Sequence, residues 1–196
     1  MKKQRVLING LGRIGRAILR INLIQDAFDL VAINDINPDN KNIAYLIKYD
    51  STFGRLNNSI ESDSDHIIID GKPIRVYHEA AIKNVDFSGV DVVIDASGVK
   101  SNSKQIEEME ATSVNGVKKY IITNVDLKSA KNIIFGVNND EIMGSRILSS
   151  SICDVVSLGP VYTVLEKNFG IQSGFLTEVP RERYIMDPFI FFAKLL

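Results

Sequence analysis

Cysteine, net charge and long apolar runs are all scarce in this sequence, and each shortage excludes a class of protein. Cys153 is the single cysteine among 196 residues, so an intrachain disulfide is excluded and a reducing compartment is expected. The formal net charge of −1 gives no electrostatic footprint for nucleic acid or for an anionic membrane surface. No apolar run approaches the roughly 18 residues of a membrane-spanning helix. We therefore expect no nucleic-acid partner and no membrane association.

Signals for export and for metal binding are missing as well. Residues 2–4 are polar, and the chain then enters a strand with too few apolar residues for the core of a secretory signal. We therefore expect a cytoplasmic location. The only two histidines, His66 and His78, flank a predicted hairpin without a cysteine or a paired carboxylate at metal-ligand spacing. We expect them to be surface residues, and we expect no metal site.

The sequence does have an ordinary globular composition and a regular alternation of patterns. It is 45% hydrophobic and 24% charged, which is enough to bury a core. Apolar strand patterns alternate with helical patterns, without internal repeats or low-complexity tracts. This order predicts an α/β protein with a doubly wound parallel sheet, the Rossmann arrangement. The predicted strands cover residues 5–9, 30–33, 90–95, 119–123 and 131–136, a hairpin covers 67–69 and 74–77, and helices cover 16–23, 37–46 and 103–115, the last capped by Ser103 and ended by Gly116.

The pattern changes near residue 149, which suggests two parts. We expect one domain over residues 1–148 and a fragment of a second α/β domain over residues 149–196. The fragment holds a predicted helix (155–168), a strand (174–179) and an apolar tail, and these elements cannot bury a core by themselves. An exposed apolar patch of this kind usually binds a partner. We therefore expect a homo-oligomer.

The turn after the first strand carries three glycines at the spacing G-x-G-x-x-G, which follows a strand and opens a helix. Gly10 permits the tight turn, Gly12 lets a pyrophosphate approach the backbone, and Gly15 lets the helix pack closely on the strand. The N-terminus of the helix offers free N–H groups and a partial positive charge to an anion. In this context the spacing predicts a dinucleotide site.

The ends of two other strands add candidate contacts. Asp35 follows the second strand and lies twenty residues after Gly15, where an acid accepts hydrogen bonds from the adenosine ribose and repels a 2′-phosphate. We therefore expect NAD rather than NADP. Ser97 and Gly98 follow the strand over 90–95, and residues at such carboxyl ends line the ligand crevice. The alternative is a tight turn in an α/β protein with Asp35 as a helix cap.

Taken in order, these segments resemble phosphorylating glyceraldehyde-3-phosphate dehydrogenase along nearly all of residues 4–180. The family usually has histidine where Phe53 stands. The resemblance implies NAD contacts from the glycine loop, including Asn9, with Arg13 and Ile14 at the pyrophosphate, and from Thr123 near the rest of the cofactor. The matching segments are residues 8–16, 34–35, 48–55, 97–99, 135–138 and 169–171, together with the register of Cys153.

The resemblance also implies a reaction. Cys153, at the start of a helix that favours a thiolate, would attack a phosphorylated aldehyde, pass hydride to NAD and leave a thioester for phosphate to cleave. Two departures oppose this. Asp154 stands where the family has threonine, and a carboxylate there opposes thiolate formation and repels phosphate. Pro180 stands where the family has its catalytic histidine, and no histidine follows His78. The neighbouring Glu178 should point to the opposite side of the strand.

Three functions follow. The first is an NAD-binding relative of glyceraldehyde-3-phosphate dehydrogenase with its catalytic machinery impaired or lost, because the base is missing and most of the family's second domain lies outside these 196 residues. Loss of a general base alone costs about 10²- to 10⁴-fold in rate. The second is an active dehydrogenase that acts through a Cys153 thiohemiacetal and thioester. The third is a protein-interaction module that no longer binds nucleotide.

Overall fold

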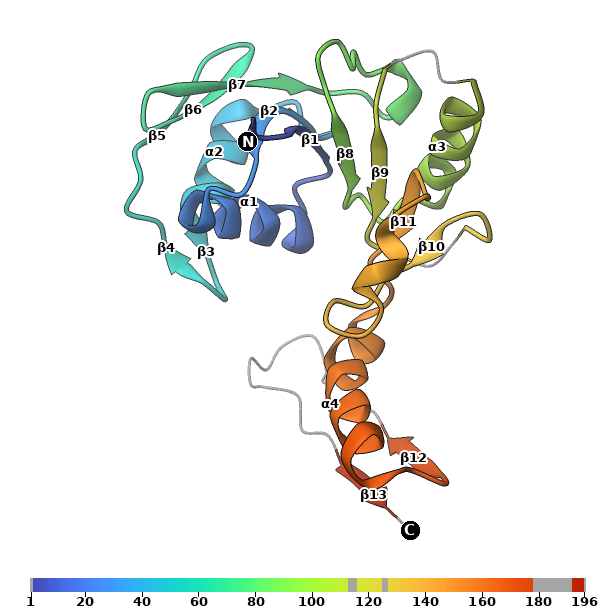
Figure 1. Ribbon diagram of the computed structural model, residues 1–196. Coiled ribbons are helices and arrows are strands. Elements are labelled where there is room, and N and C mark those ends of the chain that lie inside the picture. Colours follow the sequence, from blue (N-terminus) through green and yellow to red (C-terminus); the bar gives the residue numbers. More distant parts are fainter. Residues whose placement is uncertain (1, 113–115, 125–126, 178–191, 196) are drawn as a thin grey trace.

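A nine-stranded sheet with helices packed on it forms the body of the computed structural model (Figure 1), which describes residues 2–112, 116–124, 127–177 and 192–195. The strand order is β10-β11-β9-β8-β1-β2-β7-β6-β5. Strands β10 to β7 of that order run parallel, and the hairpin strands β6 and β5 run antiparallel to their neighbours. The strands are β1 (Arg5–Asn9), β2 (Asp29–Asn34), β5 (Ile60–Ser62), β6 (His66–Ile69), β7 (Lys72–Tyr77), β8 (Val92–Asp95), β9 (Lys119–Ile122), β10 (Lys131–Asn132) and β11 (Ile147–Ser149).

Helices cover both faces of this sheet, so the predicted doubly wound α/β fold is confirmed. Side chains alternate along a strand: on β1, Ile8 joins a buried cluster with Leu19 of α1 and Ile47 of α2, whereas Leu7 joins a second cluster with Ile106 of α3. All five are fully buried. The helices are α1 (Arg13–Gln25), α2 (Asn40–Lys48), α3 (Lys100–Thr112) and α4 (Cys153–Phe169), and the remaining short strands are β3 (Tyr49–Asp50), β4 (Gly54–Arg55), β12 (Gly174–Thr177) and β13 (Phe192–Leu195).

Helices α1 and α3 each begin three residues earlier than the sequence predicted. Helix α1 starts at Arg13, directly after its N-cap Gly12, so Gly15 lies inside the helix. Helix α3 starts at Lys100. The expectation that Ser103 caps α3 is therefore wrong: Ser103 is buried within the helix, and its hydroxyl has no hydrogen-bond partner among the described residues. The predicted end of this helix depends on residues 113–115, which lie outside the described part of the chain.

The strand predicted over residues 131–136 is also shorter than expected. Strand β10 stops at Asn132, because the side chain of Asn138 draws the chain into a turn. Its amide donates to the carbonyl of Asn132 at 3.0 Å and accepts from the N–H of Ile134 at 2.8 Å. The predicted hairpin is confirmed, with β6 and β7 joined through Asp70 and Gly71, both at positive φ.

Helix α4 differs from the other helices because it leaves the sheet and none of its residues is buried. It runs away from the sheet toward the β12–β13 pair (Figure 1). It starts at Cys153, two residues before the predicted start. The predicted strand over 174–179 is observed as Gly174–Thr177, and residues 178–191, which include most of the apolar tail, lie outside the described part. None of the described helices has both the length and the apolar character needed to cross a bilayer.

Candidate functional site

The carboxyl ends of the parallel strands meet at one edge of the sheet and bring most of the predicted site residues together. Strand β1 lies between β2 and β8, and the helices that follow β1 and β8 pack on opposite faces. The strand order therefore reverses between β1 and β8, where ligands of doubly wound sheets bind. The loops after β2, β1, β8 and β9 carry Asp35, Gly10, Ser97 and Thr123 to this edge.

The three glycines of the loop after β1 have separate structural roles. Gly10 has φ +87°, and a Cβ on it would lie 2.6 Å from the Cα of Ser97. A Cβ on Gly15 would collide with the carbonyl oxygen of Gly10. Around Gly12, by contrast, no heavy atom lies within 4 Å of the position that a Cβ would take. Gly10 and Gly15 therefore hold the turn closed, and Gly12 leaves an open surface beside the backbone that fits a pyrophosphate.

The N-terminus of α1 completes this cradle. Gly12 is the N-cap, and within the described residues no side chain caps the helix there and no acidic residue occupies its first turn. The first N–H groups of a helix lack intrahelical partners and carry the positive end of its dipole. Arg13 and Ile14 are exposed at this end, Ile14 by 53%. The site therefore suits a phosphate group.

Asp35 shapes the loop as well as facing the edge of the sheet. One of its carboxylate oxygens accepts from the N–H of Leu11 at 2.7 Å, and the other accepts from the N–H of Asn37 at 2.9 Å. Asp35 is half-buried. Because a carboxylate offers about four acceptor sites, both oxygens retain room for a ribose hydroxyl. The bond to Leu11 had no local signal in the sequence.

Ser97 and Asn9 are bound within the protein. The hydroxyl of Ser97 donates to Asp95 at 2.7 Å and accepts from the N–H of Val99 and the amide of Asn102. The amide of Asn9 is 2% exposed and donates to Asp95 at 2.8 Å. The side chains of Ser97 and Asn9 therefore support the crevice from below. Two neighbours are more open: Gly98 is exposed at φ +69° with no heavy atom within 4 Å of a Cβ position, and Thr123 is half-buried.

Cys153 comes to the same edge, because β11 runs parallel to β9 and the chain leaves β11 at its carboxyl end. Cys153 is exposed and is the first residue of α4. The turn before it is constrained: Ser151 is buried with φ +64°, and its N–H donates to the hydroxyl of Ser149 at 3.1 Å. Asp154 stands beside the thiol in the first turn of α4.

Comparison with known protein families decides what this arrangement is. The family described as "Glyceraldehyde 3-phosphate dehydrogenase, NAD binding domain" matches residues 4–103, just over half of the chain. The chain belongs to the glyceraldehyde-3-phosphate dehydrogenase family. Residues 4–103 match the family's NAD-binding domain, and NAD is the cofactor. The open surface at Gly12, the uncapped start of α1 and the carboxylate of Asp35 fit this cofactor.

Several curated members of the glyceraldehyde-3-phosphate dehydrogenase family are similar to most of the chain. The enzyme of Borreliella burgdorferi is 38% identical over 180 residues, which are 89% of this chain and 53% of that protein. Glyceraldehyde-3-phosphate dehydrogenase 1 of Candida glabrata is 39% identical over 178 residues, and the enzyme of Clostridium pasteurianum is 37% identical over 178 residues. Each alignment covers 89% of this chain and 52% of the relative. The chain spans about half the length of the curated relatives it matches.

The two histidines lie at the β6–β7 hairpin: His66 begins β6, and His78 directly follows β7. His78 is exposed, and its Nδ1 lies 3.0 Å from the carbonyl oxygen of Asp35. His66 is half-buried beside Asp63. Pro180 lies outside the described residues, as does Glu178. Within the described part, no three His, Cys, Asp or Glu side chains are grouped for a metal ion.

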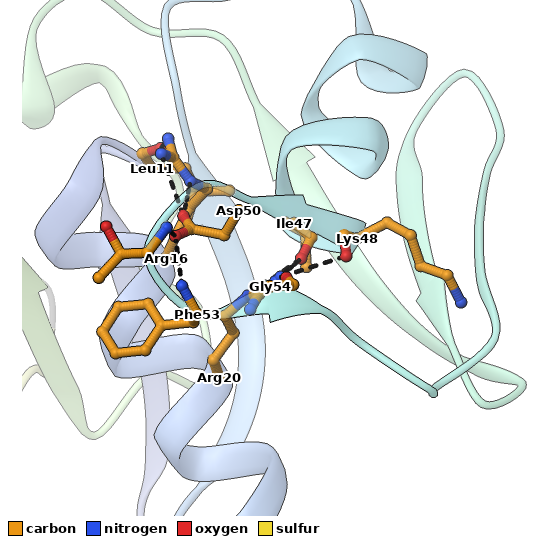
Figure 2. A network of polar contacts seen from close by, with 9 residues as sticks. Leu11, Arg16, Arg20, Ile47, Lys48, Asp50, Phe53 and Gly54 are labelled. Carbon is orange, nitrogen blue, oxygen red and sulfur yellow. Dashed lines mark hydrogen bonds and ion pairs between the residues drawn. The ribbon is translucent and has the colours of Figure 1, made fainter. Parts of the chain in front are cut away.

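The segment over residues 48–55 is fastened to the NAD-binding domain of this family member by an arginine of α1, a link that sequence analysis missed. Figure 2 shows Arg20, only 5% exposed, donating to the carbonyl oxygens of Ile47 at 2.9 Å and Gly54 at 2.8 Å. Arg20 therefore ties α1 to the end of α2 and to the β3–β4 hairpin. The hydrogen-bond partners of Arg20 are backbone carbonyls, and no pattern in the sequence reveals such partners.

A second arginine joins the same hairpin to the glycine loop. Arg16 donates to the carbonyl of Leu11 at 2.9 Å and contacts the carboxylate of Asp50 at 3.4 Å (Figure 2). Burial alone would raise the pKa of Asp50, but hydrogen bonds from the backbone N–H groups of Phe53 and Thr52 and from Arg16 outweigh it and hold that pKa below its ordinary value. Asp50 therefore stays ionised and keeps the hairpin closed.

Proposed function

We propose that this chain binds NAD across the sheet edge at the β1–β8 reversal, and that its dehydrogenase activity is impaired or lost. The proposed NAD binding is supported by the open backbone at Gly12 beside the uncapped start of α1, with Asp35 at the end of β2. NAD supplies a hydride acceptor when bound. The proposed binding residues are Asn9, Gly10, Gly12, Arg13, Ile14, Gly15, Asp35, Ser97, Gly98 and Thr123.

These residues divide into contacts and supports. We expect the pyrophosphate to lie over Gly12 and the first turn of α1, and the adenosine ribose to donate to Asp35. Gly98 and Thr123 would face the other half of the cofactor. Asn9 and Ser97 would act from beneath, since their side-chain hydrogen bonds are made within the protein.

Calorimetric titration with NAD and then NADP, on protein freed of nucleotide, tests this proposal. We expect NAD to bind in the micromolar range and NADP to bind more weakly, because Asp35 repels a 2′-phosphate. Since a hydrogen bond to a charged group is worth about 1.5–3 kcal/mol, Asp35→Ala should weaken NAD binding by roughly tenfold or more. Asp39→Ala is the matched control: Asp39 is an exposed carboxylate after the same strand, and it caps α2 by accepting from the N–H of Lys41. Absence of NAD binding by the unmodified chain would refute the proposal and favour a protein-interaction module.

The proposed loss of catalysis rests on the surroundings of Cys153. Asp154 directly follows Cys153 in the first turn of α4, and its carboxylate would repel an incoming phosphate. The printed sequence has no histidine after His78 to serve as its base. We therefore expect no turnover of glyceraldehyde 3-phosphate with NAD and phosphate above the background of the Cys153→Ala variant.

An active dehydrogenase is the second candidate, because Cys153 is exposed as the first residue of α4 on the crevice edge. In that case its thiol would add to a phosphorylated aldehyde and form a thiohemiacetal, hydride transfer to NAD would give a thioester, and phosphate would release the acyl group. Turnover that disappears in Cys153→Ala would establish this function and overturn the loss of catalysis.

We further propose that residues 1–148 act as the NAD-binding domain, that residues 149–196 belong to a second unit, and that the chain works in the cytoplasm as a homo-oligomer. The apolar surface of α4 supports the oligomer: Val161, Val164 and Phe169 are exposed by 54%, 59% and 81%. Surfaces of this kind usually bind another protein. A clean monomer in light scattering at micromolar concentration would contradict it.

A further inference from the structure

A buried chain of hydrogen bonds runs beneath the crevice and joins the ends of three strands. Asn34 at the end of β2 donates to the amide oxygen of Asn9 at 2.6 Å. Asn9, at the end of β1, donates in turn to one carboxylate oxygen of Asp95 at the end of β8, at 2.8 Å. The same oxygen accepts from the hydroxyl of Ser97 at 2.7 Å and from its N–H at 3.2 Å. A single oxygen of Asp95 therefore accepts three hydrogen bonds.

The second oxygen of Asp95 makes this residue unusual. It is buried and has no hydrogen-bond partner among the described residues, and the residue as a whole is 1% exposed. The described partners of the other oxygen, Asn9 and Ser97, are both neutral. Burying a carboxylate without a cationic partner is costly. An asparagine could offer one carbonyl oxygen to the same three donors, so packing alone does not call for a carboxylate here.

A carboxylate differs from an amide in that it only accepts hydrogen bonds. Asp95 therefore obliges Asn9 to present its NH₂ group, which leaves the oxygen of Asn9 for Asn34. The NH₂ group of Asn34 also donates to the carbonyl of Glu79 at 2.9 Å, and the oxygen of Asn34 accepts from the N–H of Glu79 at 2.8 Å. The backbone of Glu79 thus fixes one end of the chain of amides, and Asp95 accepts at the other end.

The same logic acts on the loop after β8. The hydroxyl proton of Ser97 points to Asp95, so its oxygen accepts from the N–H of Val99 at 3.2 Å and the amide of Asn102 at 3.1 Å. The backbone of Ser97 is also the surface against which Gly10 packs. Moving Ser97 would therefore move the glycine loop.

We propose that Asp95 is a positioning residue for NAD: its carboxylate anchors the β8 end of this buried chain and so holds the loop after β8 against the glycine loop, without touching the cofactor. The inference rests on the proposed NAD binding in this crevice. The adenosine side has supports of its own, since Leu11 and Asn37 hold Asp35 independently of Asp95. Loss of the carboxylate should therefore weaken NAD far more than adenosine, which has no pyrophosphate to lie over the glycine loop.

The test compares Asp95→Asn with Asp91→Asn, using NAD and adenosine as calorimetric ligands on the full chain. Asp91 precedes the same strand at the opposite edge of the sheet, where it accepts from the N–H of Arg5 at 2.9 Å. Because charge-assisted hydrogen bonds are about twice as strong as neutral ones, we expect Asp95→Asn to raise the Kd of NAD roughly tenfold. The Kd of adenosine should stay within about twofold, and Asp91→Asn should change neither by more than that.

A reciprocal exchange tests the direction of the chain. In Asn9→Asp combined with Asp95→Asn, the acceptor-only group moves to position 9, where it can accept from Asn34 and from the new amide at position 95. We expect the Kd of NAD to return to within about threefold of the unmodified chain. Asn9→Asp alone places two carboxylates side by side and should bind worst.

Each other outcome overturns the inference. If Asp95→Asn binds NAD as the unmodified chain does, Asp95 has no positioning role, although NAD binding itself stands. Equal losses for NAD and adenosine would indicate a general structural effect. If thermal melting shows that neither Asp95→Asn nor the exchanged pair folds, the chain of hydrogen bonds serves the fold rather than the cofactor. If the unmodified chain does not bind NAD, the proposed function fails first.

Discussion

The sheet edge and helix α4 both carry candidate functional residues but are built in opposite ways. At the edge, glycine packing, Asp35 and a buried hydrogen-bond chain all fix the same loops. Helix α4 is largely apolar, and none of its residues is buried. A helix that is apolar on all sides is normally buried. The loops of the sheet edge are thus fixed by contacts among the described residues, whereas those residues bury no side chain of α4.

We expect the largest loss of stability from a substitution that disrupts the sheet edge. Gly10→Ala forces an L-residue into φ +87° and pushes a Cβ to 2.6 Å from the Cα of Ser97. We expect the free energy of unfolding to fall by about 3 kcal/mol or more, measured by urea denaturation. Gly71→Ala is the control, because Gly71 has φ +80° but no heavy atom within 4 Å of a Cβ position, and it should cost about 1 kcal/mol. Equal costs would mean that contact with Ser97 does not constrain the loop.

We expect the next largest loss of stability from removing the buried guanidinium of Arg20, which holds the β3–β4 hairpin to α1. Arg20→Met leaves the carbonyl oxygens of Ile47 and Gly54 without their buried donor, and we expect a loss of about 2–3 kcal/mol in urea denaturation. The control is Arg75→Met, because Arg75 forms an exposed ion pair with Asp65 at 3.0 Å. That change should cost less than about 1 kcal/mol. A cost for Arg20→Met as small as the control would show that the hairpin is held by other contacts.

A pH dependence should follow from Asp50. Its pKa is lower in the folded chain than the ordinary value, with burial opposing and the hydrogen bonds from Phe53, Thr52 and Arg16 prevailing. A carboxyl whose pKa is depressed by folding stabilises the fold above its unfolded pKa, and this contribution is lost as the pH falls through the folded value. We therefore expect urea stability to decline below a pH of about 4. In Asp50→Asn this part of the decline should vanish; an unchanged profile would refute the assignment.

We expect the smallest loss of stability from a substitution on α4, compared here with one on the buried face of α2. Val164→Ala should change the free energy of unfolding by less than about 0.5 kcal/mol, because Val164 is 59% exposed. Ile47→Ala on α2, where the side chain is fully buried, should cost about 2–5 kcal/mol. A loss above about 1 kcal/mol at Val164, especially one that grows with protein concentration, would mean that a second copy covers α4 in solution.

The features that sequence analysis predicted are those with short-range causes. The roles of Gly10 and Gly15 follow from backbone sterics within one turn, and the β6–β7 hairpin follows from Asp70 and Gly71. The early start of α1 was missed because Gly12 and Gly15 lower the helix propensity of this segment. In the structure, the close packing of Gly15 on the carbonyl of Gly10 overrides that propensity. The doubly wound topology and the family were confirmed because the order of elements is itself a sequence property.

The supports of the site could not be predicted, because their partners lie far apart along the chain. Asp95 and Asn9 are 86 residues apart, and Arg20 reaches a carbonyl at Gly54, 34 residues away. Ser97 was correctly placed at the crevice edge, but its hydroxyl bonds depend on Asp95 and Asn102, which no local pattern links. Backbone carbonyls as partners leave no trace in the sequence at all.

The route by which the chain leaves the sheet has a consequence for how this family member can be assembled. Strand β11 is followed directly by the constrained turn at Ser151 and then by α4. The turn therefore sets where any polypeptide after residue 152 begins: at the carboxyl edge of the sheet, beside the loop that follows β9. The starting point of the next element is fixed by a single strained residue rather than by a flexible linker.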